Sequence, residues 1–463
     1  MQRKVIVSTA VGTLILVIIW LGGCNQSTNA VRIDVDTAVT YQTITGWEAV
    51  AQAGQLECPG FANYQNELFD LAVQDLGINR LRLELGSGAE NPADSFAQMQ
   101  AGELGMGQWL GRRYESRNDN DDPNLINPTG FHFSELDFTM EQVVLPMRER
   151  LAAQGETLYI NLTLVDFKRD GDQSDVHYQD APEEYAELIL AAFLHLQEQY
   201  GFVPDGVEMI LEPDVAGWQN GRQVGNALVA AGNKLQDHGF QSDFIAPSNT
   251  DMGRAIAWFD EMMTVPGAEI YLTELAYHRY RGVSHKRLQA IADRAEQYNI
   301  QTAMLEHIGS GVDDLHEDLT VGQNSAWEQF ALAFCLAEDD GSAYFLVGDG
   351  RVQLSKHSQF LRQYFRFVRR GAVRVAASSS RNEFDPVAFV DRNGRVTLII
   401  KADRSSEFQV EGLPEGEYGV MWTTDKIYGR ELPIITLLPH QTLTIQLPEK
   451  GVLTVYPHDD INK

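Results

Sequence analysis

The sequence contains few cysteines, and their spacing excludes two kinds of stabilised small domain. Three cysteines occur in 463 residues, at positions 24, 58 and 335, and no two form a CxxC pair. Three cysteines without this spacing are too few for a framework of several disulfides or for a four-cysteine zinc site. Cys335 lies in an apolar stretch of helical character and Cys58 in a loop. We therefore expect two unpaired thiols in preference to one bridge.

Positive charge is also scarce, and this restricts the partners of the protein. The chain has 36 Lys and Arg against 65 Asp and Glu, a formal net charge of −29. Such a surface repels phosphates, so nucleic acid is not expected as a partner. No glycine-rich phosphate motif follows the first predicted strand, and no Gly-x-Ser-x-Gly elbow is present. We expect no cofactor and no metal, and for the acidic run 118–122 we expect a solvated loop, because it lacks the spacing of a calcium loop.

Only one long hydrophobic run is present, and it lies at the N-terminus. Arg3 and Lys4 precede an apolar segment over residues 5–21, which ends in Leu21-Gly-Gly-Cys24. This pattern predicts an export signal over 1–23; the alternative is an anchor helix, because the run approaches the roughly 20 residues of a membrane span. The ending resembles the lipobox of bacterial lipoproteins. That resemblance implies a palmitate-type lipid anchor on Cys24, a tether over 24–30 and, with Asn25 next, placement at the outer membrane in preference to the inner one.

From residue 44 to about 369, short β-rich runs alternate with amphipathic runs of helical length. The alternation predicts βα units around a parallel sheet, and eight units favour a closed (β/α)₈ TIM barrel over an open sheet. The predicted strands are 44–50, 79–85, 158–165, 206–212, 244–247, 269–277, 302–306 and 342–347. The predicted helices include 64–76, 140–153, 182–200, 219–238, 285–298 and 325–338.

After residue 369 the pattern changes to short alternating strands separated by turn signals. The predicted strands are 373–377, 387–391, 395–401, 407–410, 418–423, 443–446 and 452–456. Asn393-Gly394 between two of them is a strong hairpin signal. We expect a C-terminal β-sandwich domain over 370–460, completed by an N-terminal strand over 31–43 that alternates in the same way.

One connection within the barrel is much longer than the others. Residues 86–137 follow the second strand, are rich in Asn, Asp, Gly and Arg, and contain Trp109, Arg113 and Tyr114. Loops of this length in a compact domain are usually functional or disordered. Because it follows a strand, we expect it to form a wall of a cleft at the C-terminal face of the barrel.

Two glutamates end predicted barrel strands. Glu212 follows the apolar fourth strand and precedes Pro213, and Glu306 ends the apolar seventh strand. These strands lie on opposite sides of an eight-stranded ring, so their carboxylates can face each other across its mouth. Two carboxylates about 5–5.5 Å apart are what a retaining glycosidase requires. The alternative is that Glu306 makes only a structural pair, and that Asp214 is the acid in place of Glu212.

The order of a strand-four Glu-Pro, a strand-six aromatic-His, a strand-seven Glu and a β-sandwich resembles glycoside hydrolase clan A. The barrel-opening segment 41–47 is most similar to family thirty, which includes glucosylceramidases, xylanases and galactanases. The resemblance implies that Glu212 is the acid/base, Glu306 the nucleophile and Arg82 the cation that keeps it ionised. It also implies that His278 and Tyr280 contact the nucleophile and the sugar. Further candidates for binding the sugar are Trp47, Asn161 and Asn249.

One position departs from the clan pattern. Leu211 stands where clan A enzymes usually have an Asn that binds the sugar 2-hydroxyl. This departure keeps a second hypothesis open, a catalytically inactive glycan-binding lipoprotein on the same barrel. The partner in both cases is an oligosaccharide or polysaccharide. The sugar, its linkage and the oligomeric state stay open. The acidic composition argues weakly against polyuronate substrates, although Arg112, Arg113 and Arg279 could form a local basic site for acidic sugars.

Overall fold

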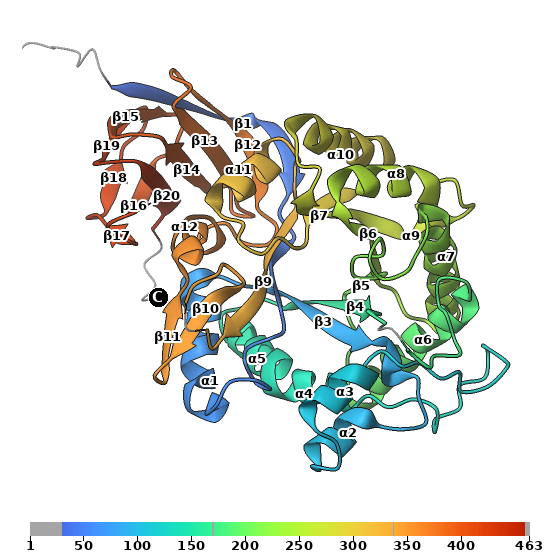
Figure 1. Ribbon diagram of the computed structural model, residues 1–463. Coiled ribbons are helices and arrows are strands. Elements are labelled where there is room, and N and C mark those ends of the chain that lie inside the picture. The colour runs from blue at the N-terminus through green and yellow to red at the C-terminus, as the bar shows by residue number, and fades with distance from the viewer. Residues whose placement is uncertain (1–29, 169–170, 337, 459–463) are drawn as a thin grey trace, which may run out of the picture.

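The computed structural model describes residues 30–168, 171–336 and 338–458. The expected signal peptide, Cys24 and most of the tether lie outside this range. Figure 1 shows a barrel on one side and a β-domain on the other, with helix α12 (Lys356–Phe365) between them. In the described part of the chain, no helix combines the length and the apolarity that a membrane span requires.

The first domain is a closed parallel β-barrel. Its strands pair in the order β2 to β9, and β9 pairs with both β8 and β2, which closes the ring. Within the described residues this ring has eight strands, as a TIM barrel requires. The strands are β2 (Gly46–Val50), β3 (Arg80–Gly86), β4 (Tyr159–Val165), β5 (Gly206–Glu208), β6 (Asp243–Asp251), β7 (Leu272–Arg281), β8 (Gln301–Met304) and β9 (Ala326–Phe334).

Helices cover the outside of the barrel, as Figure 1 shows. Helix α6 begins with Pro182, followed by two glutamates that suit the positive end of the helix dipole. Its end is at Gly201, which adopts the left-handed conformation. The helices that follow barrel strands are α1 (Phe61–Asp70, continued as a π-helix Leu71–Leu76), α5 (Leu145–Ala153), α6 (Pro182–Tyr200), α7 (Gly221–Asp237), α8 (Met252–Met262), α10 (His285–Tyr298), α11 (Val312–Thr320) and α12.

The eighth barrel strand differs from the prediction. Residues 325–338 were expected to be a helix, but Ala326–Phe334 is strand β9. The expected eighth strand, 342–347, is a real strand, β10 (Ala343–Gly348), yet it lies outside the ring and forms a hairpin with β11 (Arg351–Leu354). A short apolar run has no periodicity that distinguishes a buried strand from a buried helix, and here pairing with β2 and β8 decides the outcome.

The second domain is one curled sheet of ten strands in the described chain. The N-terminal strand β1 (Val31–Thr43) lies between β12 and β15, antiparallel to the first and parallel to the second. All seven strands predicted here are present, and β17 (Arg430–Glu431) and β18 (Ile435–Leu437) are additional. The others are β12 (Val373–Ser379), β13 (Phe384–Val390), β14 (Val396–Ala402), β15 (Ser406–Glu411), β16 (Gly416–Thr424), β19 (Leu443–Leu447) and β20 (Gly451–Pro457).

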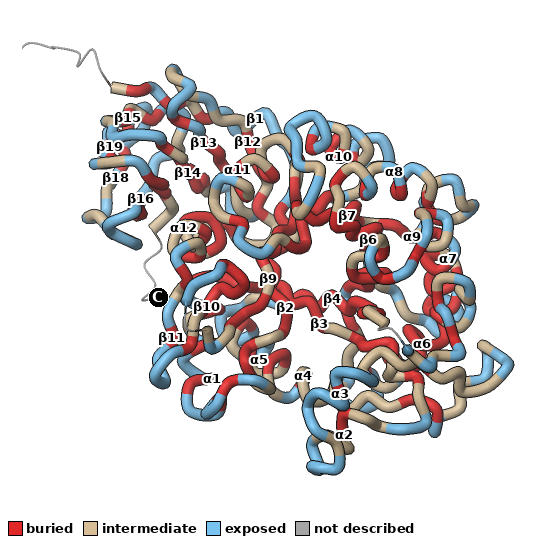
Figure 2. The backbone as a smooth tube through the Cα atoms, in the orientation of Figure 1, coloured by how far each residue is buried: buried red, intermediate tan, exposed pale blue. Residues whose placement is uncertain are grey.

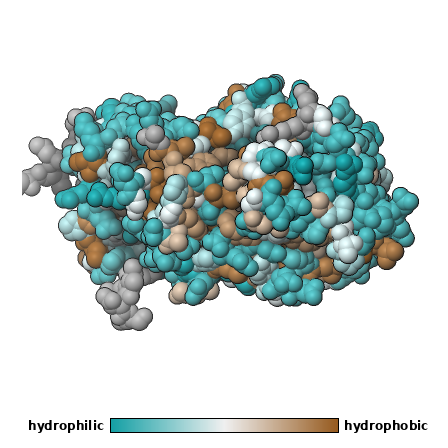
Figure 3. Space-filling model, turned by 60° about the horizontal axis from the view of Figure 1, so that its bottom comes forward, coloured by the Kyte–Doolittle hydropathy of each residue, from teal (hydrophilic) through white to brown (hydrophobic). Residues whose placement is uncertain are grey.

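Figure 2 shows that buried residues follow the barrel strands, and Figure 3 shows one face that is hydrophilic over much of its area, with hydrophobic residues gathered toward its middle. The barrel interior has two parts. Ile245, Ala276, Ala303, Leu305 and Ala326 form a small apolar cluster. The remaining interior is charged, because the fully buried guanidinium groups of β3 need carboxylate partners.

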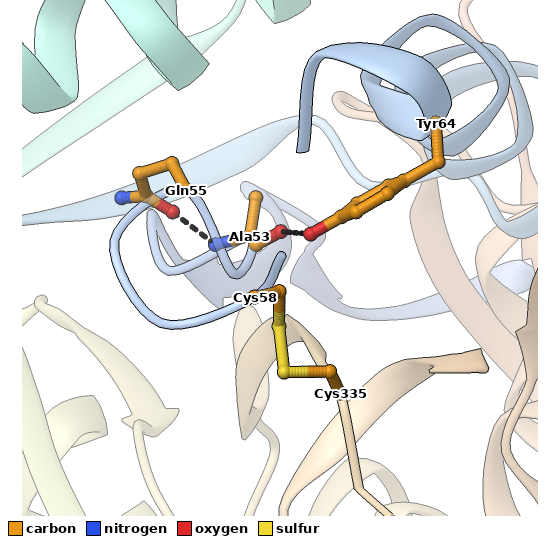
Figure 4. Close-up of a disulfide and its surroundings, with 5 residues drawn as sticks. All are labelled: Ala53, Gln55, Cys58, Tyr64 and Cys335. Carbon is orange, nitrogen blue, oxygen red and sulfur yellow. Dashed lines mark hydrogen bonds between the residues drawn. A yellow bond between two sulfur atoms is a disulfide. The ribbon is translucent and has the colours of Figure 1, made fainter. Parts of the chain in front are cut away.

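A disulfide joins Cys58 and Cys335, with the two Cα atoms 5.6 Å apart (Figure 4). The expectation of two unpaired thiols was therefore wrong. It assumed that Cys335 lies in a helix, whereas this residue directly follows β9. Because β9 pairs with β2, the segments that follow these two strands lie beside each other. Cys58 belongs to the segment that follows β2. The bond links the first and last strands of the barrel.

Candidate active site

Glu212 and Glu306 converge at the C-terminal end of the barrel. Glu212 lies four residues beyond the end of β5, and Glu306 two residues beyond the end of β8. One oxygen of each carboxylate and one ring nitrogen of His278 lie within 4.8 Å of one another. Two carboxylates and a histidine at this spacing could also hold a metal ion. The expectation from the sequence that the protein has no metal therefore stays a prediction. The two glutamates selected from the sequence thus form one site.

The backbone at Glu212 is unusual. Its φ of 49° places it in the left-handed region, although it is not a glycine. The strand was expected to extend to Glu212, but β5 ends at Glu208, and a loop carries the chain over the barrel mouth. A non-glycine residue in this conformation costs on the order of 1–3 kcal/mol and is concentrated at functional sites. The strain at Glu212 supports a functional role for its side chain.

Glu306 is buried and accepts hydrogen bonds from two side chains. Arg82 Nη2 donates to Oε2 at 2.5 Å, and Tyr280 Oη donates to Oε1 at 2.8 Å. Arg82 comes from β3 and Tyr280 from β7, so strands on two sides of the barrel fix the carboxylate. Burial raises the pKa of Glu306, but Arg82, His278 and the two hydrogen bonds outweigh it and lower this pKa below its ordinary value. The group is therefore held ionised.

Glu212 has a different environment. Its side chain is 15% exposed, and His278 Nδ1 lies 3.0 Å from Oε1 and donates to it when protonated there. His278 itself is fully buried. Burial lowers its pKa, but the hydrogen bond to Glu212 and the charges of Glu306 and Glu212 raise it more, so its pKa lies above the ordinary value. The site therefore contains two carboxylates with different hydrogen-bond partners, and a ring nitrogen of His278 lies within 4.8 Å of an oxygen of each.

Carboxylates also fill the barrel beneath the site, and the sequence did not identify them. Glu328 on β9 is fully buried and lies 3.1 Å from Arg82 Nη1. Below it, Arg80 contacts Glu48 and makes two hydrogen bonds to Glu274, at 3.0 and 2.7 Å. Burial raises the pKa of Glu48 to about 7 and that of Glu328 well above its ordinary value. Glu328 was missed because its segment was interpreted as a helix.

Two of the expected sugar-binding residues, Trp47 and Asn161, make no hydrogen bond to Glu212 or Glu306 in the described chain and pack elsewhere in the barrel. Trp47 is fully buried, stacks on Phe365 at 4.5 Å and donates from Nε1 to the carbonyl of Val368 at 2.6 Å. Asn161 is buried in the interior, where its amide donates to Glu48 at 2.8 Å and to Glu208 at 3.2 Å. Neither presents a free face to a ligand. Both belong to the packing of the barrel.

Asn249 and Asp214 lie near the end of β6, the strand that pairs with β5. Asn249 on β6 is fully buried, and neither polar atom of its amide has a hydrogen-bond partner among the described residues. Asp214 accepts two hydrogen bonds from Thr250, one from the backbone at 2.9 Å and one from the hydroxyl at 2.8 Å. The carboxylate of Asp214 is therefore committed to holding β6, which favours Glu212 over Asp214 as the acid.

The long segment after β3 contains short helices α2 (Ser95–Gln100) and α3 (Met106–Arg112), and α4 (Ser134–Thr139) begins near its end. Figure 1 shows these helices together along the lower edge of the barrel, away from the β-domain. Side chains of this segment line a cavity together with Arg82 and Glu84 of β3. Trp109, expected in a cleft wall, is among them but is only 3% exposed.

No protein-family model matches the sequence, and a search of curated proteins finds no match. Solved structures do match. The catalytic domain of a GH30 xylanase C from Talaromyces cellulolyticus has a TM-score of 0.68 at 14% identity, over 92% of this chain and 100% of that one. A conserved exported protein from Bacteroides fragilis has a TM-score of 0.67 at 14% identity (91% and 99% covered), and an endo-β1,6-glucanase has 0.62 at 14% (91% and 94%). The chain therefore has the fold of the GH30 enzymes of glycoside hydrolase clan A.

Proposed function

We propose that the protein is a retaining glycoside hydrolase that cleaves a β-linked glycan, with Glu306 as nucleophile and Glu212 as acid/base. The observation that carries the proposal is the convergence of the two carboxylates within 4.8 Å at the barrel mouth. Inverting enzymes leave about 6.5–9.5 Å between the carboxyl groups for a water molecule, whereas retaining enzymes place them about 5–5.5 Å apart. The separation favours direct attack by one carboxylate.

In the first step, the ionised Glu306 attacks the anomeric carbon while protonated Glu212 gives its proton to the leaving glycosidic oxygen. The C–O bond to the leaving group breaks, and an ester forms between the sugar and Glu306. In the second step, Glu212 takes a proton from water, the water oxygen attacks the anomeric carbon, and the ester breaks. Arg82 and Tyr280 stabilise the carboxylate that is released.

His278 serves the acid/base through its contact with Glu212. The ring is fully buried, and its Nδ1 contact at 3.0 Å helps to hold the Glu212 carboxyl in place. A positively charged His278 also stabilises Glu212 after it has lost its proton to the leaving group. His278 is thus a positioning residue that supports both steps.

One observation favours a second function, a glycan-binding protein without turnover. Leu211 is 5% exposed and precedes Glu212, and it offers no hydrogen bond to a sugar. Hydrogen bonds to the 2-hydroxyl can contribute several kcal/mol in the transition state. The binding hypothesis predicts saturable oligosaccharide binding with no product after long incubation. The two donors that hold Glu306 ionised, Arg82 and Tyr280, favour the hydrolase, because a nucleophile must be ionised.

We also propose that the protein is exported and anchored through a lipid on Cys24, at the outer membrane. The support is the Leu21-Gly-Gly-Cys24 sequence and the polar residues that follow it. The disulfide between Cys58 and Cys335 is in keeping with an oxidising compartment. Mass spectrometry of the mature N-terminus tests this: an acylated Cys24 is expected, and a chain that still begins at Met1 would contradict it.

The function is tested with protein that begins after Cys24, beside its Glu306→Gln variant. Release of p-nitrophenol or reducing sugar is measured from a panel of β-linked glycosides and of plant, algal and bacterial glycans. The hydrolase predicts that at least one substrate is cleaved by the wild type and not by the folded variant. Equal cleavage by both would reject the mechanism, and binding without any release would support the glycan-binding function.

A further inference from the structure

A cavity lies beside the nucleophile, between β3 and the long segment that follows it. Its lining includes Arg82 and Glu84 from β3, Gln52 from the segment after β2, and Arg113 and Glu135. Arg82 donates to Glu306 at 2.5 Å. The cavity therefore shares Arg82 with the proposed catalytic site, and we take it as the place for a neighbouring part of the substrate.

Each nitrogen of Arg113 in this cavity already has a partner within the protein. Its Nε donates to Glu135 at 2.7 Å, one Nη donates to Glu84 at 3.0 Å, and the other donates to Tyr114 Oη at 2.9 Å. The side chains of Arg113, Glu84 and Glu135 are 15%, 12% and 24% exposed. When both are ionised, these two partly buried carboxylates more than neutralise the one guanidinium. Burial raises the pKa of Glu135 against the opposing effect of Arg113, so the net negative charge of the trio is complete only above that pKa.

Two other arginines near Glu306 are also paired with carboxylates. Arg82 lies between the carboxylates of Glu306 and Glu328 and donates to the carbonyl of Leu305. On the opposite flank, the backbone N–H of Arg279 donates to the carbonyl of Glu306. The Arg279 guanidinium contacts Asp318 at 2.5 Å and both Glu317 and Asp314 at 3.0 Å. The local basic site that the sequence left open is therefore not free at Arg113 or Arg279.

Resting on the proposed function, we infer that the cavity beside Arg82 binds an uncharged, hydroxyl-rich sugar and that Glu84 and Glu135 exclude uronic acids from it. Sugar hydroxyls can donate to the carboxylates and to the amide oxygen of Gln52, whose nitrogen donates to Glu84. A uronate would lose its hydration beside two carboxylates without gaining an unpaired cation. The preference for uncharged sugars thus arises from repulsion of the uronate by Glu84 and Glu135 as much as from hydrogen bonds to the uncharged sugar.

The first test compares matched substrates with the wild-type protein. The probes are p-nitrophenyl β-D-glucoside against p-nitrophenyl β-D-glucuronide, and each glycan that is cleaved against its own C6-oxidised form. Oxidation changes one hydroxymethyl group into a carboxylate and leaves the linkage alone. We expect kcat/KM for the uncharged member to exceed that of the charged member at least tenfold. Equal or faster cleavage of the charged member would overturn the inference while leaving the hydrolase intact.

The same comparison is repeated as binding, by calorimetry on the Glu306→Gln variant. Tighter binding of the uncharged oligosaccharide is expected even if turnover is slow. Binding of both forms with equal affinity would overturn the inference. If no member of the panel is bound or cleaved, the proposed function itself fails. Equal affinity or equal cleavage overturns the inference alone, so the two failures are distinguishable.

The role of the acidic pair is tested by Glu135→Gln and by Glu84→Gln combined with it. These changes remove negative charge beside Arg113, so the charged substrate should gain and the tenfold preference should shrink toward equality. Glu103→Gln is the matched control, because Glu103 is an exposed carboxylate on the same segment and does not line the cavity. Thermal unfolding confirms the fold, and the single variant serves if the double variant does not fold. A folded variant that keeps the full preference would overturn the assignment to this pair.

Discussion

Arg82 connects Glu306, the proposed nucleophile, to the barrel core through both ends of its guanidinium group. One Nη donates to the Glu306 carboxylate at 2.5 Å, and the other donates to the carbonyl of Leu305 at 2.9 Å while it lies 3.1 Å from Glu328. The backbone before the nucleophile and its side chain are thus held by one buried residue. Because the donors are already in place, little reorganisation is needed when Glu306 is released as a carboxylate.

Replacing Tyr280 by Phe removes the second donor to Glu306. We expect kcat/KM to fall about 10- to 100-fold, because a preorganised donor to the reacting group is lost. The pKa of Glu306 is lowered in the folded protein, and losing a donor raises it. The acid limb of the rate profile should therefore move to higher pH, by up to about one unit, which corresponds to about 1.4 kcal/mol.

The matched control for this experiment is Tyr298→Phe, because Tyr298 lies on α10, is 37% exposed and is remote from the carboxylates. Its profile should coincide with that of the wild type. A Tyr280→Phe protein with an unchanged rate and an unchanged acid limb would mean that the hydrogen bond to Glu306 has no part in the reaction.

Glu48 predicts a pH dependence of stability. Burial raises its pKa from 4.5 to about 7, so the folded state holds a proton that the unfolded chain releases above pH 4.5. The stability associated with this proton is complete below pH 4.5 and is lost as the pH rises through about 7, by about 3 kcal/mol. Glu48→Gln cannot ionise. Its unfolding free energy should fall less between pH 5 and pH 8 than that of the wild type.

Urea unfolding at the two pH values measures this difference. Only the change with pH is compared, because the amide also alters the contact with Arg80. Glu67→Gln, an exposed carboxylate on α1, should show the wild-type change. If Glu48→Gln also loses as much stability as the wild type between pH 5 and pH 8, Glu48 is ionised in the folded protein.

The disulfide between Cys58 and Cys335 should stabilise the closed barrel. It joins residues 277 apart in the sequence and therefore restricts the unfolded chain strongly. Replacing both by Ser is expected to lower the unfolding free energy by about 2–5 kcal/mol. Reduction of the wild type should lower its Tm to about that of the double variant, and the Tm of the double variant should not change with reductant. A Tm that is insensitive to reductant would show that the bond does not form in solution.

The sequence located the two catalytic candidates but not the network that holds them. Glu212 and Glu306 could be found because each carboxylate follows an apolar run, and Arg82 because the family resemblance marks it. Glu328 was missed because the run from Ala326 to Phe334 fits a helix as well as a strand, and only ring closure selects the strand. Trp47 was taken for a sugar-binding residue because its position in the strand does not reveal that it packs on α12.

The central claim is that Glu306 attacks the sugar directly and Glu212 serves as acid and base. Proton NMR of the first product formed from a cleaved β-glycan, recorded before mutarotation, tests it most directly. The account predicts that the product appears first as the β-anomer, because two successive displacements retain the configuration. An α-anomer formed first would mean a single displacement by water, and it would contradict the assignment of Glu306 as the nucleophile.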